Sequence, residues 1–63
     1  MQIYTQFIYE KTWSKTTKEQ AVKIIKEEMP QTDPEATLSY ILQEIQKGKI
    51  ITFGECRFKL MDH

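Results

Sequence analysis

The 63-residue sequence predicts an α+β fold in which two helices pack on one face of a three-stranded antiparallel sheet. Three observations predict this fold: a β-rich segment over residues 2–9, two amphipathic segments with helical periodicity after it, and a hairpin pattern over residues 50–61. Each element has an apolar face too narrow to be stable alone in water, and the two-layer packing buries all of these faces together. We expect one small domain over residues 1–63.

The first expected strand covers residues 2–9, which are rich in β-branched and aromatic side chains and contain no Gly, Pro or acid. Ile3, Thr5, Phe7 and Tyr9 share one face of this strand, because side chains alternate along a strand. The alternation of apolar and polar residues is imperfect, so we expect partial cover on both sides. We also expect this segment to be an edge strand.

The first helix is expected to begin at a capping box, Thr16-Thr17-Lys18-Glu19, in which Thr16 is the cap and Glu19 reaches back to the Thr backbone. It should end near Met29, because Pro30 pushes the residue before it out of the helical region. The apolar residues with helical spacing in this segment are Ala21, Val22, Ile24, Ile25 and Met29.

The second helix is expected to begin with Asp33 as N-cap and Pro34 at the first helical position, where a missing N–H costs nothing. It should run to about Lys47, with Gly48 as its terminator. Its apolar stripe is Leu38, Ile41, Leu42 and Ile45, and its far side carries Ala36, Ser39, Tyr40, Gln43 and Lys47.

The hairpin prediction rests on Gly54-Glu55, a two-residue turn with Gly where a type II′ turn requires positive φ. If Phe53 and Cys56 flank this turn, Ile51 lies opposite Phe58. The alternation then places an apolar set on the inner face: Ile51, Phe53, Cys56, Phe58 and Leu60. Thr52, Arg57 and Lys59 occupy the other face.

Composition argues against an enzyme. The only histidine is His63, at the end of the printed sequence, and Cys56 is predicted to be a buried hydrophobe. The sequence has neither the clustered ligands of a metal site nor a glycine-rich phosphate loop, so we expect no metal, cofactor or small-molecule substrate. A lone cysteine, no leader and no apolar span predict a soluble cytoplasmic protein with no membrane partner.

The order of helix, connector, helix and hairpin over residues 16–61 resembles the winged-helix DNA-binding domains at the level of fold. The resemblance implies that residues 34–47 form a recognition helix whose outward side chains enter the major groove, and that residues 50–61 form the wing. The residues expected to meet DNA are Ser39, Tyr40, Gln43 and Lys47 at the bases, with Lys47, Lys49, Arg57 and Lys59 at phosphates. The alternative interpretation is a solvated helix face and cations that protect a strand edge.

The only tryptophan, Trp13, lies among Lys11, Lys15 and Lys18. An indole flanked by lysines can stack on a base or anchor a protein interface. In so small a core, Trp13 is also expected as a lid that closes the end of the sheet.

Nine basic and nine acidic residues make the chain formally neutral, and Arg57 is the only arginine. Neutrality favours a small regulatory protein that binds another protein over one that binds nucleic acid. We expect such a protein, of a bacterial or phage type, to form a homodimer through residues 2–9 or through Tyr40 and its neighbours. The alternative is a winged-helix-like DNA-binding transcriptional regulator.

Overall fold

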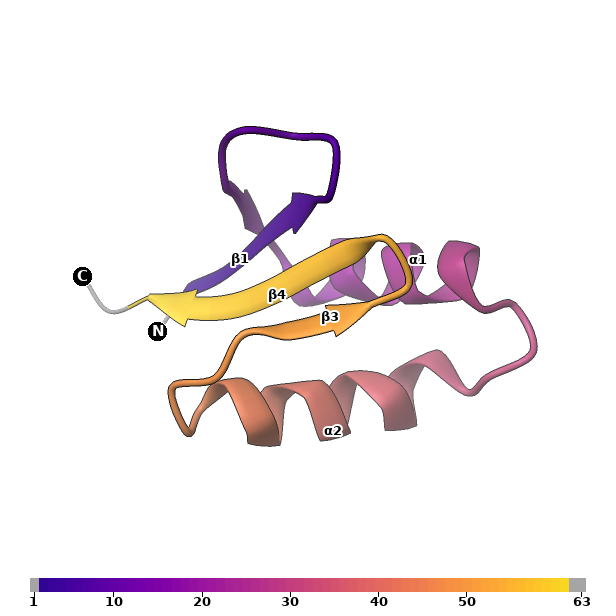
Figure 1. The fold of residues 1–63 in the computed structure, drawn as a ribbon. Coiled ribbons are helices and arrows are strands. Elements are labelled where there is room, and N and C mark those ends of the chain that lie inside the picture. The colour runs from indigo at the N-terminus through magenta and orange to yellow at the C-terminus, as the bar shows by residue number, and fades with distance from the viewer. Residues whose placement is uncertain (1, 62–63) are drawn as a thin grey trace.

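The computed structural model describes residues 2–61, which form an α+β fold with two helices and a four-stranded antiparallel sheet (Figure 1). The elements in chain order are β1 (Gln2–Phe7), β2 (Ser14–Thr16), α1 (Lys18–Glu28), α2 (Pro34–Ile45), β3 (Ile51–Phe53) and β4 (Cys56–Met61). The predicted class is confirmed. The predicted number of strands was wrong, because β2 was not expected.

β2 is short and polar, so it carries no pattern of alternating apolar residues that would predict a strand. A buried pair of hydroxyl groups joins it to β1: Thr5 Oγ1 and Thr16 Oγ1 lie 2.6 Å apart, and Thr16 Oγ1 donates to the Ser14 carbonyl at 3.2 Å. A buried hydroxyl needs such a partner. β2 therefore pairs along β1, with Ile3 opposite Thr16 and Thr5 opposite Ser14.

The strand order is β2-β1-β4-β3, so β1 lies inside the sheet. The prediction that residues 2–9 form an edge strand was wrong, because β1 pairs with β2 on one side and β4 on the other. β1 also ends at Phe7, after which Ile8 and Tyr9 form a turn. A homodimer made through an open edge of β1 is therefore not available.

The hairpin has the predicted register, with Ile51 opposite Phe58 and Phe53 opposite Cys56. Gly54 adopts φ of +61°, as its place in the turn requires. The hairpin is also tied to α1, because the Glu55 N–H donates to the Glu28 carboxylate. This hydrogen bond fixes the turn against the last turn of the helix.

α1 begins one residue later than expected. Thr17 is its N-cap: its hydroxyl accepts from the Gln20 N–H at 3.1 Å, and the Gln20 side chain accepts from the Thr17 N–H. The predicted cap, Thr16 with Glu19, was wrong because the Thr16 hydroxyl is used inside the sheet.

α2 begins as predicted, with the Asp33 carboxylate accepting from the N–H groups of Glu35 and Ala36 and with Pro34 at the first position. It ends at Ile45 and not at Lys47, because the chain tightens into turns in which Gly48 donates to the Ile45 carbonyl. Gly48 has φ of +88°, the conformation expected of a helix terminator.

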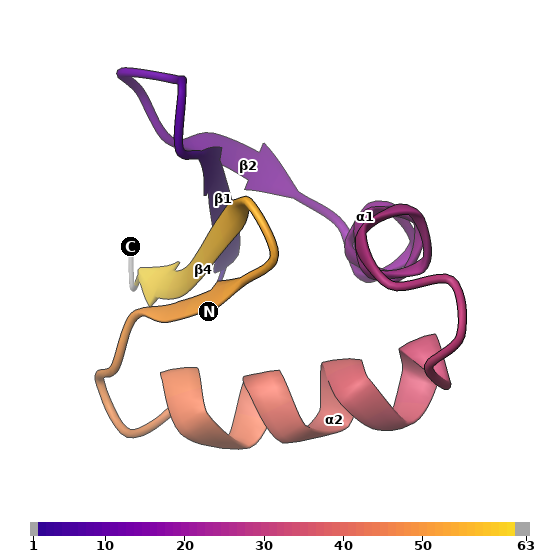
Figure 2. The same ribbon diagram turned by 45° about the vertical axis from the view of Figure 1, so that its right-hand side comes forward.

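Both helices cover the same face of the sheet. Figure 2 shows α1 end-on while α2 lies across the view, so the two helices cross instead of running side by side. The buried apolar residues between the layers are Ile3, Ala21, Ile25, Leu38, Ile41, Ile45, Cys56 and Phe58. No helix of residues 2–61 lies on the other face of the sheet.

The winged-helix likeness is not confirmed. The chain enters α1 from β2, which β1 separates from β4 and the rest of the hairpin. The wing predicted over residues 50–61 is instead half of a continuous sheet, paired along the whole of β1.

The turn at Gly54 provides a test of this packing. A Cβ at Gly54 would overlap the Glu28 carboxylate, whereas a Cβ at Gly48 would meet open space, and both residues have positive φ. We expect Gly48→Ala to lose about 1 kcal/mol of unfolding free energy from backbone strain alone. Gly54→Ala should lose clearly more in denaturant unfolding; equal losses would contradict the close contact with Glu28.

Candidate binding surface

The sheet face turned away from the helices carries two rows of side chains set by strand register. Lys15, Tyr4 and Lys59 lie opposite one another on β2, β1 and β4, and Gln6, Arg57 and Thr52 lie opposite one another on β1, β4 and β3. Their sequence neighbours point into the core, so these side chains point outward. We call this set, together with Trp13, the outer face: Tyr4, Gln6, Trp13, Lys15, Thr52, Arg57 and Lys59.

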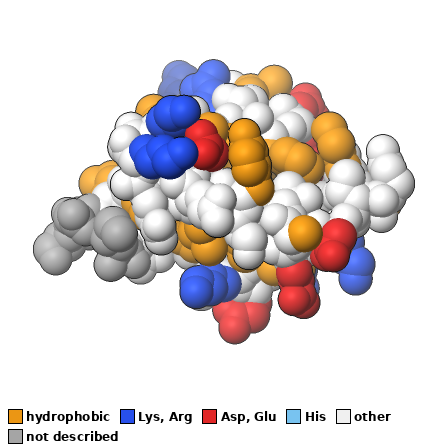
Figure 3. Space-filling view, turned by 90° about the horizontal axis from the view of Figure 1, so that it is seen from below, with side chains coloured by type: hydrophobic (Ala, Val, Ile, Leu, Met, Phe, Trp, Pro, Cys, Tyr) orange, Lys and Arg blue, Asp and Glu red, His pale blue; other side chains and the backbone are white. Residues whose placement is uncertain are grey.

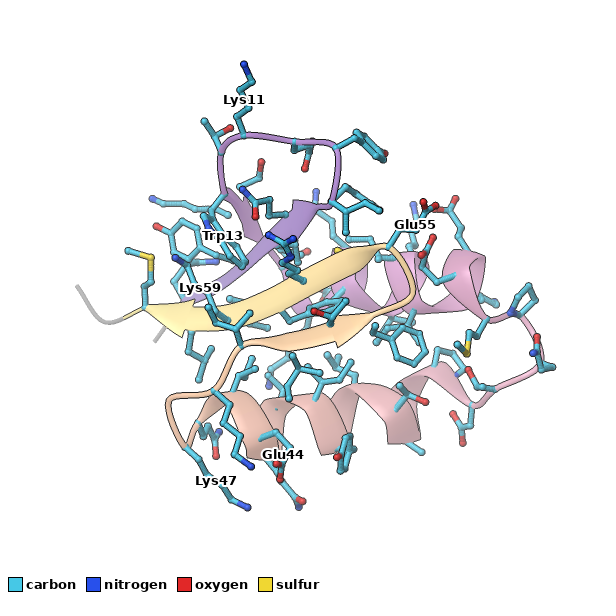
Figure 4. The ribbon with its side chains drawn as sticks, viewed as in Figure 1. Lys11, Trp13, Glu44, Lys47, Glu55 and Lys59 are labelled. Carbon is cyan, nitrogen blue, oxygen red and sulfur yellow. The ribbon has the colours of Figure 1, made fainter. Side chains whose placement is uncertain are left out.

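Trp13 precedes β2 and lies on the outer face beside Lys59 (Figure 4). Lys59 Nζ is 4.2 Å from the centre of the indole ring, and both side chains are half-buried. Such a cation–π contact contributes about 0.5–1 kcal/mol at an exposed site. Trp13 was also expected as a lid that closes the end of the sheet. The pairing of β2 with β1 places it on the sheet face that points away from the helices, beside Lys59.

Arg57 is held on the outer face by its neighbour on β1. Its Nη1 donates to Gln6 Oε1 at 3.1 Å, and Gln6 is only 7% exposed while Arg57 is exposed. A guanidinium has five N–H donors in a rigid plane. The bond to Gln6 therefore orients the group, and the exposed part of the plane faces solvent.

Charge is unevenly distributed over the neutral chain. Lys15, Arg57 and Lys59 make the outer face cationic, and no carboxylate of residues 2–61 belongs to it. The acidic residues of the described chain lie on the helices, their connector and the loops at one end of the sheet: Glu10, Glu19, Glu27, Glu28, Asp33, Glu35, Glu44 and Glu55. Six lysines share these helices and loops with the eight acidic residues, so the charge of the described chain outside the outer face is nearly balanced. Formal neutrality thus hides a cationic sheet face.

Three of these carboxylates lie where β1 ends and β4 begins. Glu10 accepts from the Phe7 N–H at 2.9 Å, and Glu28 accepts from the N–H of Glu55, which precedes Cys56. Phe7 and Cys56 are opposite each other in the sheet. One end of the outer face is therefore bounded by negative charge.

The predicted DNA-reading stripe on α2, Ser39, Tyr40, Gln43 and Lys47, is exposed as expected, and Tyr40 is 58% exposed. Its charge is locally balanced. Figure 3 shows this side of the molecule, where cationic and acidic side chains are interspersed.

Glu44 is the source of this balance. Its carboxylate lies 3.0 Å from Lys49 Nζ and 3.1 Å from Lys47 Nζ. The hydrogen bonds from Lys49 and then Lys47 lower the pKa of Glu44, so it stays ionised beside them. Two of the four cations predicted to meet phosphates thus already share a carboxylate.

The seven residues predicted as one partner or DNA site fall on two surfaces: Ser39, Tyr40, Gln43 and Lys47 on α2, and Trp13, Arg57 and Lys59 on the outer face (Figure 4). Because α2 packs on the inner face of the sheet, its exposed stripe and the outer face point away from each other. The structure does not bring them together. Sequence reasoning named Lys15 only as a neighbour of Trp13 and did not assign Tyr4 or Gln6 to the site. Strand pairing places all three beside Lys59 and Arg57.

Cys56 is fully buried, as predicted, and its Sγ donates weakly to the Arg57 carbonyl at 3.8 Å. Burial raises the pKa of the thiol to about 11, and the nearby charges of Glu28 and Glu10 act in the same direction. A neutral, enclosed thiol is a poor nucleophile at pH 7.

A hollow of about 330 Å³ lies where the α1 N-terminus, the end of α2 and β1 meet. Its lining has an apolar part, Ile3, Leu42 and Leu60, and a polar part, Gln2, Thr16, Thr17, Lys18 and Gln46. Among residues 2–61, Lys18 is the only ionisable side chain that lines this hollow.

Within residues 2–61, no group of three or more His, Cys, Asp or Glu side chains is arranged to hold a metal ion. Among the same residues, neither helix has the length and apolar character needed to cross a bilayer. His63 lies outside the described residues.

The raised pKa of Cys56 predicts a pH dependence of stability. The folded protein holds the thiol proton up to about pH 11, whereas the unfolded chain releases it near the ordinary value of 9.0. The buried thiol therefore contributes to the free energy of unfolding below pH 9, where it is neutral in both states. This contribution should be lost as the pH rises from 9 to 11, because the unfolded chain then releases the proton more readily than the folded protein. Cys56→Ala removes it, so the difference in unfolding free energy between the two proteins should change over this range; a constant difference would contradict the buried thiol.

Comparison of the chain with protein-family models, with curated proteins and with solved structures found no match. The surface chemistry described above is therefore the basis for any functional proposal.

Proposed function

We propose that this chain is a small non-enzymatic regulatory protein that binds another protein with the outer face of its sheet. The observation that supports the proposal is the outer face itself, where three cations and two aromatic rings lie together and no described residue contributes a carboxylate. Aromatic residues and arginine are enriched at the energetic centres of protein interfaces. The complementary surface on the partner is acidic.

The same face suits a protein partner better than single-stranded nucleic acid. A base binds by stacking on the exposed face of an aromatic ring. The ammonium of Lys59 already occupies one face of the Trp13 indole. A nucleic-acid strand that ran along the sheet would also meet the carboxylates of Glu10, Glu28 and Glu55 at its end. A partner with a small acidic patch meets neither obstacle.

The predicted binding of duplex DNA has less support. It requires the exposed stripe of α2 to contact the same duplex as Arg57 and Lys59 on β4. These groups lie on opposite surfaces of the molecule. Glu44 would also approach the phosphates together with Lys47. Pairing of two copies through Tyr40 stays a prediction.

Site-specific photo-crosslinking tests the proposal. A benzophenone amino acid is placed at Thr52, which is exposed on the outer face, or at Ser39, which is exposed on α2, in cells that make the protein. We expect a protein adduct from position 52. Adducts from position 39 alone would contradict docking on the outer face, and a nuclease-sensitive adduct would contradict a protein partner.

Charge reversal supplies the matched control. Arg57→Glu should reduce the adduct from position 52 by about tenfold, because it places a carboxylate against an acidic partner. Lys23→Glu makes the same change of charge at an exposed position on α1 and should leave the yield unchanged. Equal loss from both variants would contradict a specific role for the outer face.

A further inference from the structure

We infer that the partner of the outer face presents an extended segment with acidic side chains at alternate positions, which lies along β4. This inference rests on the proposed function and adds the chemistry and direction of the bound segment. It follows from the spacing of the two β4 cations, from how each is held, and from what bounds them along the strand.

Arg57 and Lys59 lie on the same face of β4, two residues apart. Two residues of a strand span about 7 Å. An extended segment of the partner has the same repeat, so its side chains at positions i and i+2 reach both cations together. Adjacent acidic residues would point to opposite sides of such a segment, and only one of them could reach the outer face.

Both cations are held in place before binding. The bond to Gln6 orients the Arg57 guanidinium, whose planar fork matches a carboxylate, and the indole of Trp13 supports the ammonium of Lys59 from one side. A carboxylate can approach Lys59 from the other side without displacing Trp13. Less side-chain entropy is lost on binding when the cations are already ordered.

The outward side of β4 has different chemistry beyond Arg57 and beyond Lys59. Glu55 precedes Cys56 at the Arg57 end and would repel an acidic residue there, whereas the half-buried Met61 follows at the other end, in the next outward position after Lys59. The pattern expected in the partner is therefore two acidic residues and one apolar residue at alternate positions. Lys15 is two strands away from β4 and is expected to contribute only at long range.

The test uses the full chain, labelled with nitrogen-15, and synthetic capped peptides as probes. The first peptide, Thr-Glu-Thr-Glu-Thr-Leu-Thr, has the expected alternation, and its isomer Thr-Thr-Glu-Glu-Thr-Leu-Thr has the same composition with adjacent acids. Trp13 is the only tryptophan, so its indole N–H resonance and its fluorescence both report on the outer face. We expect the alternating peptide to bind at least about fivefold more tightly than the isomer.

Variants test whether the segment runs along β4 or crosses the strands of the sheet. Arg57→Glu and Lys59→Glu should each remove the shift of the Trp13 indole resonance, and Lys23→Glu on α1 should leave it unchanged. Lys15→Glu should weaken binding by less than half as much as Lys59→Glu. Equal effects of Lys15→Glu and Lys59→Glu would overturn the placement along β4, because they would mean that the segment crosses the strands.

Other results separate this inference from the proposed function. Equal affinity for the two peptides, or no binding of either, would overturn the alternating segment, while protein adducts from position 52 would still support docking on the outer face. Tighter binding of a thymidine oligonucleotide than of the alternating peptide, with quenching of Trp13, would overturn both in favour of single-stranded nucleic acid.

Discussion

The pairing of the first and last strands of the sequence, β1 and β4, is the interaction on which the rest of the structure depends. Six residues of β1 lie opposite six residues of β4, from Gln2 with Met61 to Phe7 with Cys56. Without β1, β3 and β4 would be an isolated hairpin, which is marginally stable in water. The pairing closes a loop that contains both helices, so its entropic cost must be offset by the core that the helices build on Ile3 and Phe58. Sheet and helices therefore stabilise one another.

This arrangement also creates the candidate site. The two helices cover one face of the sheet, and no helix of residues 2–61 covers the opposite face of β1 and β4 (Figures 1 and 2). A solvated face needs only mixed polar and charged side chains to stay soluble. The outer face instead combines Trp13, Tyr4 and three cations. No carboxylate of the described chain lies on it, although acids equal bases in the whole sequence. This separation of charge is the reason to propose binding there.

Local features were predictable from the sequence. Asp33-Pro34 identified the start of α2, and Gly54-Glu55 identified both the hairpin turn and its register, because each signal involves neighbouring residues. The start of α1 was misplaced because the hydroxyl of Thr16 has a partner, Thr5, that lies eleven residues earlier. β2 and the interior position of β1 were missed for the same reason: both depend on pairing between distant segments.

The candidate site was predictable only as separate residues. Trp13, Arg57 and Lys59 were identified from their chemistry, yet their meeting on one surface depends on the order β2-β1-β4. Lys15 had only its closeness to Trp13 as a signal, and Tyr4 and Gln6 had none that linked them to the site. They matter because register sets them beside Lys59 and Arg57.

The contact between Trp13 and Lys59 requires the β2-β1-β4 order and the open outer face together, so it provides the most direct test. Solution NMR of the full chain should show side-chain methylene protons of Lys59 shifted upfield by the indole ring, with nuclear Overhauser contacts between the two side chains. Ordinary methylene shifts for Lys59, with Overhauser contacts from Trp13 to core residues such as Ile25, would contradict the outer face described here.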